Sequence, residues 1–219
     1  LLYLSIYFIS FLIETVRAET QKQLEEAKRR YRHLYRHDAL TGLYNRYGLY
    51  ESLEKIPDRE RDLPLAVTMF DIDHFKSIND RYGHEFGDRV LVSVSDTIRE
   101  VGEGGICCRW GGEEFLLISR RAEDAEETAN RICERIAART IPCDGGTLTV
   151  TVSAGVSLAP RMRDAGIHDM IDRADKALYR SKRGGGNRVA VAPPPVSADA
   201  GEAEPECVLP PEDSHAAEE

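Results

Sequence analysis

Two adjacent acidic residues at the centre of a short motif are the first candidates for chemistry. Residues 109–115 read Arg-Trp-Gly-Gly-Glu-Glu-Phe, between apolar runs at 106–108 and 115–118. Adjacent glycines permit a tight reversal, so the segment predicts a β-hairpin with Glu113 and Glu114 at its tip. A solvated turn would show the same pattern, and the hairpin alone therefore assigns no chemistry.

A third carboxylate, Asp71, follows an apolar run at residues 65–70. This pattern predicts a buried strand that delivers Asp71 to its end, where α/β folds place ligand sites. If the strand lies beside the hairpin, Asp71 and Glu113 converge and supply the oxygen ligands that Mg²⁺ prefers. A helix N-cap is the structural alternative for Asp71 taken alone.

Three ordered motifs extend these observations to a known family. They are DALTGLYNR at 38–46, DIDHFKSINDRYGHEFGD at 71–88 and GGEEF at 111–115. Together they resemble the GGDEF diguanylate cyclases over roughly residues 36–190. The resemblance implies an enzyme that condenses two GTP into cyclic di-GMP and releases two pyrophosphates. Since each ribose 3′-hydroxyl attacks the α-phosphate of the other nucleotide, two GTP-loaded domains must face each other in a homodimer.

The resemblance also implies a role for individual residues. Metal ligands would be the carboxylates of Asp71 and Glu113 and the main-chain carbonyl of Ile72, with two Mg²⁺ per GTP site and Mn²⁺ as a possible substitute. Glu113 or Glu114 would assist removal of the 3′-hydroxyl proton, and the sequence does not separate the two. Lys76 would stabilise phosphate charge in the transition state. Backbone N–H groups of residues 73–76 would cradle the phosphates.

Substrate recognition is assigned in the same way. Asn79 and Asp88 would read guanine, and because relatives that accept ATP depart at the position of Asp88, we expect GTP at both half-sites. His84 would contact the substrate or cap a helix. The full set of implied substrate-binding residues is Asn79, His84, Asp88, Phe75 and Lys182.

Two positions depart from the family pattern. Gly186 stands where the family carries a phosphate-binding Arg, and Arg183 or Arg188 would have to replace it. Gly102 and Gly105 occupy the positions of the family's Arg-x-x-Asp product site, so we expect no noncompetitive inhibition by micromolar product there. Three hypotheses therefore compete: an active cyclase, a degenerate module that binds GTP or cyclic di-GMP, and a purely structural signalling dimer.

The N-terminal part of the chain predicts a membrane-linked signalling helix. Residues 1–13 are apolar but shorter than the roughly 20 residues that cross a bilayer, so we expect the end of a transmembrane helix, with the start of a buried amphipathic helix as the alternative. Basic residues between 17 and 30 place the remainder of the chain in the cytoplasm, beneath a bacterial inner membrane. Residues 14–37 predict a helix, and Leu24, Ala27, Tyr31 and Leu34 follow the seam of a parallel coiled coil. A solvated single helix is the alternative.

The remaining chain predicts one catalytic domain, residues 38–192, and a tail. Expected helices span 45–56, 75–81, 85–101, 122–138 and 167–181, and strands 65–70, 147–158 and 188–192 flank the hairpin. This order fits an α+β fold with a palm-like central sheet that contains antiparallel strands, flanked by helices and preceded by the long coiled-coil helix. Residues 193–219 hold six of the ten prolines and predict an acidic, disordered tail.

Charge and cysteine content exclude other classes of function. The net charge is −9, but residues 189–219 carry eight acidic residues and no Lys or Arg, which leaves about −1 for the rest. The folded part thus gives no electrostatic case for a nucleic-acid polymer as partner. The expected partners are GTP, a second copy, the membrane and, indirectly, receptors of cyclic di-GMP. The five cysteines form no C-x-x-C pair, which indicates neither a zinc site nor a disulfide framework.

Overall fold

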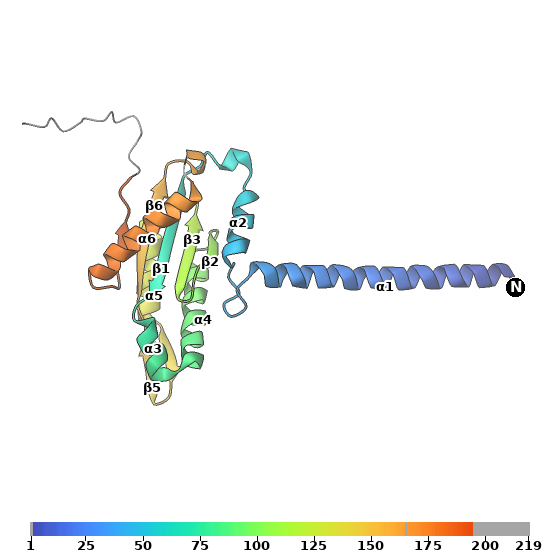
Figure 1. Ribbon diagram of the computed structural model, residues 1–219, viewed down its shortest axis with the longest axis horizontal. Helices are drawn as coiled ribbons and strands as arrows, with labels where there is room; N and C mark the ends of the chain where they lie inside the picture. Colours follow the sequence, from blue (N-terminus) through green and yellow to red (C-terminus); the bar gives the residue numbers. More distant parts are fainter. Residues whose placement is uncertain (1, 165, 195–219) are drawn as a thin grey trace, which may run out of the picture.

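The domain predicted for residues 38–192 is built on a five-stranded mixed sheet. The computed structural model describes residues 2–164 and 166–194 (Figure 1). The strands are β1 (Leu65–Ile72), β2 (Ile106–Arg109), β3 (Glu114–Ser119), β6 (Val152–Ala159) and β7 (Val189–Val191), in the spatial order β2-β3-β1-β6-β7. All neighbours are antiparallel except β6 and β7, which are parallel. The predicted α+β class and the central antiparallel hairpin are confirmed.

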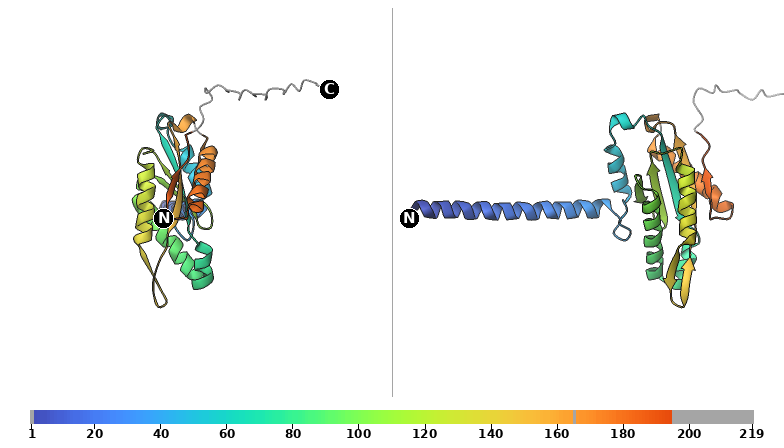
Figure 2. Two further views of the ribbon diagram at one scale, coloured as in Figure 1. Left: turned by 90° about the vertical axis from the view of Figure 1, so that its left-hand side faces the viewer. Right: turned by 180° about the vertical axis from the view of Figure 1, so that it is seen from behind.

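Helices cover both faces of the sheet (Figures 1 and 2). On one face α3 (Phe75–Tyr82), α4 (His84–Val101) and α5 (Ala125–Ala138) pack over a core that includes Phe70 and Phe115. On the other face α2 (Arg46–Glu54) and α6 (Ile167–Arg183) pack over Met69 and Leu116. Strand β1 is buried along its whole length because side chains on both of its faces are covered.

Close contact between α6 and the sheet depends on one glycine. A Cβ on Gly155 of β6 would lie 2.1 Å from the carbonyl oxygen of Ala174 and 2.2 Å from the amide nitrogen of Leu178. Any side chain at 155 would therefore push α6 outward. The C-terminal end of α6 carries Lys182, so this contact fixes one wall of the candidate site.

The N-terminal helix α1 (Leu2–Arg36) projects from the domain as a single rod (Figure 1). Its predicted seam residues Leu24, Tyr31 and Leu34 are exposed in the single chain. Among the described residues, no helix combines the length and the apolar character needed to cross a membrane. The predicted tail lies beyond residue 194, outside the described residues, apart from its first two positions.

One predicted strand was wrong. Residues 147–158 form two strands in different sheets: β5 (Gly146–Thr149) pairs with β4 (Thr140–Cys143), and only β6 joins the central sheet. The reversal between β4 and β5 is made by Asp144 and Gly145, with Gly145 at φ +90°. The expectation missed β4 because Pro142 and the Gly-Gly turn resemble a loop.

Several element ends also differ from the prediction. Helix α5 begins at Ala125 rather than at 122, and α2 ends at Glu54 rather than at 56. The start of α2 is fixed by Asn45, whose side chain accepts a hydrogen bond from the Gly48 amide. Two short 3₁₀ helices, Asp58–Glu60 and Met162–Asp164, were not predicted. The described cysteines (Cys107, Cys108, Cys133 and Cys143) are free thiols.

Candidate active site

The end of β1 and the hairpin turn lie side by side, as the sequence predicted. Asp71 of β1 is paired with Glu114 of β3 in the antiparallel register, and the Ile72 amide donates to the carbonyl oxygen of Glu113 at 3.4 Å. The turn is closed by the Trp110 amide, which donates to the Glu114 carbonyl at 2.8 Å. The end of β1, which carries Asp71, and the turn between β2 and β3, which carries Glu113, therefore meet at one edge of the sheet.

Gly111 lets the Glu114 side chain fold back over the turn. A Cβ at position 111 would lie 2.4 Å from Glu114 Oε2. Apart from its two chain neighbours, a Cβ at position 112 would lie more than 4 Å from every other side chain and from the rest of the backbone, so the two glycines of the motif differ in the space around them. Gly111 makes room for a carboxylate, whereas Gly112 leaves the tip open to solvent and ligand.

Burial raises the pKa of all three carboxyl groups at this edge, and nearby negative charges add to the rise. Burial raises the pKa of Asp71, which is only 7% exposed, and the Lys182 ammonium opposes this rise through an ion pair at 2.6 Å. Burial and the charge of Asp71 raise the pKa of Glu113 and of Glu114. The negative charge of Asp71 thus disfavours ionisation of both glutamates, and a bound cation would relieve that repulsion.

The chemistry of these donors fits a divalent cation with oxygen ligands. Asp71 Oδ1 is buried and receives no hydrogen bond of normal geometry, although it forms the ion pair with Lys182. Within residues 2–164 and 166–194, no three His, Cys, Asp or Glu side chains already surround a common point. Two carboxylates and one main-chain carbonyl leave coordination positions for water and phosphate oxygens, which is how proteins usually bind Mg²⁺.

Asp73 was missed as a site residue, and the structure gives it a different environment from Asp71. Its carboxylate accepts hydrogen bonds from Thr151 Oγ1 at 2.8 Å, Ser153 Oγ at 2.7 Å and the Asn187 amide at 2.9 Å. Its own amide donates to the Thr151 carbonyl, so this N–H is not free for phosphate. The predicted cradle of residues 73–76 is therefore corrected to residues 74–76.

The predicted guanine-reading residues lie on α3 and α4. Asn79 of α3 packs against Gly87 of α4, where a Cβ would lie 1.9 Å from Asn79 Oδ1. This Oδ1 is buried without a hydrogen-bond partner among the described residues. Asp88, the residue after Gly87, is exposed. An unsatisfied buried acceptor is costly unless a ligand or water supplies a donor.

The other predicted residues of this region divide between surface and core. Lys76 is exposed on α3, which suits contact with a charged ligand. His84 is exposed as the first residue of α4, and no side chain caps that helix, so the alternative capping role of His84 is not seen. Phe75 is buried in the core beneath Gly87, and its aromatic ring shapes the gap between α3 and α4.

The loop after α6 forms a pocket of 290 Å³ with the end of β1. Its lining residues are Asp73, His74, Lys182, Gly185 and Gly186. Neither arginine proposed to replace the missing Arg at 186 lines it. Arg183 lies over the ring of Tyr179, with its guanidinium carbon 5.9 Å from the centroid, and Arg188 donates to the carbonyl of Gly186. Lys182, near the C-terminal end of α6, is therefore the cation that lines this pocket.

The entry motif is bonded directly to the hairpin turn. Asp38 forms an ion pair with Arg109, and Arg109 donates to the carbonyl of Gly112 at 2.7 Å. Arg46 donates to the carbonyl of Trp110 at 2.5 Å and stacks over its ring. The Arg before Trp-Gly-Gly was the available sequence signal, because a guanidinium carries five N–H donors that can bind carboxylate and carbonyl oxygens.

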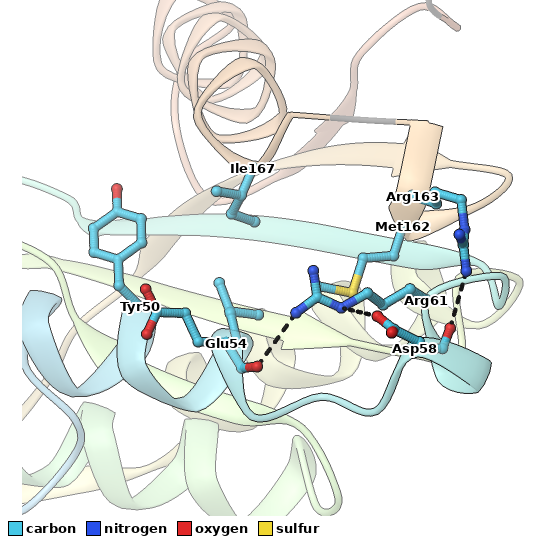
Figure 3. Close-up of a pocket in the computed structure, with 8 residues that line it drawn as sticks. Tyr50, Glu54, Asp58, Arg61, Met162, Arg163 and Ile167 are labelled. Atoms are coloured by element: carbon cyan, nitrogen blue, oxygen red, sulfur yellow. Dashed lines mark hydrogen bonds and ion pairs between the residues drawn. The ribbon is translucent and has the colours of Figure 1, made fainter.

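A larger cavity of 460 Å³ lies elsewhere, between α2 and the start of α6 (Figure 3). Leu53, Met162 and Ile167 give it an apolar part, and Arg61 is held by the carbonyl of Glu54 and the carboxylate of Asp58. None of its lining residues belongs to the predicted site. Size alone is therefore a poor guide to the reactive region of this molecule.

A diguanylate cyclase GGDEF-domain family model matches residues 35–188. The chain belongs to this GGDEF family. The diguanylate cyclase DgcP of Pseudomonas aeruginosa is 41% identical over 160 residues, covering 71% of this chain and 24% of DgcP. DgcM of Escherichia coli is 38% identical over 179 residues, covering 78% of this chain and 41% of DgcM. This GGDEF chain thus spans well under half the length of these curated relatives.

Solved GGDEF structures share the fold. The coiled coil and GGDEF domain of DgcB from Caulobacter crescentus, in complex with c-di-GMP, aligns with a TM-score of 0.73 at 31% identity, covering 82% of this chain and 99% of that one. Diguanylate cyclase SiaD of Pseudomonas aeruginosa, in complex with its activator SiaC, aligns with a TM-score of 0.68 at 30% identity, covering 87% of this chain and 76% of SiaD. The GGDEF fold with a preceding helix is therefore the architecture of this chain.

Proposed function

We propose that this chain is a diguanylate cyclase that condenses two GTP into cyclic di-GMP and releases two pyrophosphates. The observation that carries the proposal is the pairing of β1 with β3, which brings Asp71 beside Glu113 and Glu114 at one edge of the sheet. Relatives and structural neighbours named for diguanylate cyclases support the same reaction.

The residues that would hold divalent cations are Asp71, Glu113 and the carbonyl of Ile72. Two such ions, Mg²⁺ or Mn²⁺, would neutralise triphosphate charge and increase the acidity of the attacking hydroxyl. Glu113 and Glu114 are the candidates for accepting its proton. The raised pKa of both side chains brings them closer to the operating pH, which suits a general base.

Nucleotide recognition would divide between two regions. Asn79 and Asp88 would pair with the N1–H and exocyclic amine of guanine, and adenine would leave these polar groups unpaired. Lys76 and Lys182 would face the phosphates. The amides of residues 74–76, at the start of α3, would complete the phosphate contacts.

A second copy of the chain would complete the active site. Leu24, Tyr31 and Leu34 are exposed along α1, and a parallel partner helix would bury them. We also propose that residues 1–13 anchor this dimer at the bacterial inner membrane with the catalytic domain in the cytoplasm. Fractionation of cells that produce the full-length protein tests the location, and recovery of the protein without membranes would contradict it.

A nucleotide-binding module without turnover is the second candidate. Gly186 in place of Arg removes a phosphate contact, and one relative, 37% identical over 171 residues, is named cyclic di-GMP phosphodiesterase NbdA of Pseudomonas aeruginosa. A GGDEF domain therefore also occurs in a protein named for the reverse pathway.

Purified protein incubated with GTP and Mg²⁺ separates the candidates. We expect cyclic di-GMP and two pyrophosphates for each product molecule, measured by chromatography of the nucleotides. Binding of GTP without product selects the nucleotide-binding module. Neither binding nor turnover would contradict both proposals and leave the structural dimer.

A further inference from the structure

Asp73 joins three separate parts of the chain through its carboxylate. Oδ1 accepts from Ser153 of β6, whereas Oδ2 accepts from the side chain of Thr151 and from the main-chain amide of Asn187. Asn187 belongs to the loop between α6 and β7. The carboxylate therefore holds that loop against the ends of β1 and β6.

The other hydrogen bonds of this loop run to α6 and β6, since the Arg188 carbonyl accepts from the Ala154 amide and from the Ser181 hydroxyl. Gly185, Gly186 and Asn187 all have positive φ values, of 109°, 74° and 48°. A Cβ on Gly186 would lie 3.2 Å from the Asp73 carboxyl carbon, so the glycine backbone packs directly on this carboxylate. The amides of residues 184–186 donate to carbonyl oxygens of α6. The Asn187 amide instead donates to the carboxylate of Asp73, which directly follows β1.

We propose that Asp73 is the positioning residue that fixes the glycine loop and Lys182 as the wall of the triphosphate pocket. The pocket is lined by Asp73, Lys182, Gly185 and Gly186 together with His74. Asp73 acts through the loop and is not a ligand of the divalent cation. The inference rests on the proposed function for the identity of the ligand.

The contrast between the two acids of Asp71-Ile72-Asp73 supports this division. Asp71 Oδ1 is paired with the charged Lys182 ammonium at 2.6 Å, whereas both Asp73 oxygens accept hydrogen bonds from neutral donors. A carboxylate whose oxygens already accept hydrogen bonds from the protein has little need of a cation as a further partner. Replacing such a carboxylate with an apolar side chain removes the hydrogen bonds that hold its neighbours in place.

Hydrogen-bond chemistry makes Asp73→Asn a conservative rescue variant. The Oδ1 partner is a hydroxyl, Ser153 Oγ, which can turn and accept from an amide NH₂. The amide oxygen can then occupy the Oδ2 position and accept from Thr151 and Asn187. Asp73→Asn thus keeps all three contacts without the charge, and Asp73→Ala removes them.

The first measurement uses the protein without nucleotide. We expect the Asn187 amide to be protected from hydrogen exchange in the wild type and in Asp73→Asn, and to exchange at least about tenfold faster in Asp73→Ala, because a hydrogen bond to a carboxylate is lost. Equal exchange rates in wild type and Asp73→Ala would overturn the inference. This readout does not depend on any activity of the protein.

The second measurement compares the affinities for GTP and GMP. For Asp73→Ala we expect the GTP dissociation constant and KM to rise about tenfold, with GMP affinity changed less than twofold and kcat less than threefold. Asp73→Asn is expected to regain most of the GTP affinity. Asp62→Ala, which removes an exposed partner of Arg163, is the matched control. An equal loss of GTP and GMP affinity, or a collapse of kcat in Asp73→Asn, would overturn the assignment.

The two proposals fail in different ways. If the wild type binds no GTP, the proposed function falls, while the hydrogen-exchange result still decides whether Asp73 holds the loop. If the wild type makes cyclic di-GMP and Asp73→Ala matches it in both measurements, the inference alone falls.

Discussion

Asp38 and Arg109, 71 positions apart, form an ion pair in which Arg109 Nη1 lies 3.1 and 3.2 Å from the two carboxylate oxygens. Both side chains are mostly buried, with 24% of Asp38 and 16% of Arg109 exposed. Arg109 also donates two hydrogen bonds to the carbonyl of Gly112. The entry motif after the linker helix is thus connected through one guanidinium to the turn that presents Glu113.

Removing this connection is expected to lower turnover. Hydrogen bonds to charged groups contribute roughly 1.5–3 kcal/mol, so Arg109→Ala should reduce kcat about tenfold or more if the turn loses its position. Asp38→Asn should have a smaller effect, and the double variant should match Arg109→Ala. Steady-state rates test this, with Arg99→Ala at the exposed pair with Asp96 as control. Additive losses would show that the residues act independently.

Gly87→Ala tests the position of Asn79, the side chain that we propose reads guanine. The new methyl group would lie 1.9 Å from Asn79 Oδ1 and must displace that amide. We expect KM for GTP to rise about tenfold, since a mispositioned amide loses roughly 1–2 kcal/mol of recognition. Gly166→Ala, which meets nothing within 4 Å, is the control. An unchanged KM for Gly87→Ala would place guanine elsewhere.

Gly186→Arg tests whether the family's missing cation matters. The structure adds a penalty, because Gly186 has φ +74° and its Cβ would lie 3.2 Å from the Asp73 carboxyl carbon. A left-handed conformation costs a non-glycine residue roughly 1–2 kcal/mol. We expect the free energy of unfolding to fall by about that amount while KM for GTP falls about fivefold, equivalent to about 1 kcal/mol of phosphate binding.

The matched control for this variant is Gly145→Arg. Gly145 has φ +90°, meets nothing within 4 Å and lies in the turn between β4 and β5. The Gly145→Arg variant has the same conformational penalty as Gly186→Arg, and it adds the same charge at a position outside the pocket lined by Lys182 and Gly186. If Gly145→Arg lowers KM equally, or Gly186→Arg leaves KM unchanged, the phosphate contact is refuted.

Divalent cations are expected to stabilise the protein in a pH-dependent way. Burial is the main cause that raises the pKa values of Asp71, Glu113 and Glu114, and the charge of Asp71 adds to the rise at both glutamates. Below the unfolded carboxyl pKa of about 4 these groups are neutral in both states. As the pH rises towards their higher folded values, their ionisation lowers the free energy of unfolding. A cation that binds the ionised acids reverses this loss.

Thermal denaturation at about pH 5 and pH 7.5 checks the prediction. We expect Mg²⁺ with GTP to raise Tm more at the higher pH. Asp71→Asn should lose most of this ligand-induced increase in Tm. Without metal and nucleotide, the Tm of Asp71→Asn should be equal to or above that of the wild type. Asp172→Asn, at an exposed pair with Lys176, serves as control. An increment that is independent of pH, or intact in Asp71→Asn, would contradict the cation site.

The local sequence pattern was sufficient to predict the strand and the hairpin that carry Asp71 and Glu113. The apolar run before Asp71 and the Gly-Gly turn before Glu113 predicted a strand and a hairpin, and the structure pairs them. Strand β4 could not be predicted in the same way, because its pairing with β5 depends on a turn whose glycines also occur in loops.

Tertiary contacts explain what sequence pattern left out. Nothing local distinguishes Asp73 from Asp71, since both are acids at the end of one strand. Their difference arises from Thr151, Ser153 and Asn187, which are distant in sequence and satisfy only Asp73. In the same way, the lack of space at Gly102 and Gly105, where a Cβ would lie 2.9 and 2.7 Å from Leu117, could not be predicted from composition.

The most direct test of the proposed cation site is a crystal structure of the protein with Mg²⁺ and a non-hydrolysable GTP analogue. We predict an ion about 2.0–2.1 Å from oxygens of Asp71, Glu113 and the Ile72 carbonyl, with phosphate oxygens completing its coordination. Guanine should lie against Asn79 and Asp88. Asp71 and Glu113 pointing apart, with no ion between them while nucleotide is bound, would contradict the proposed chemistry.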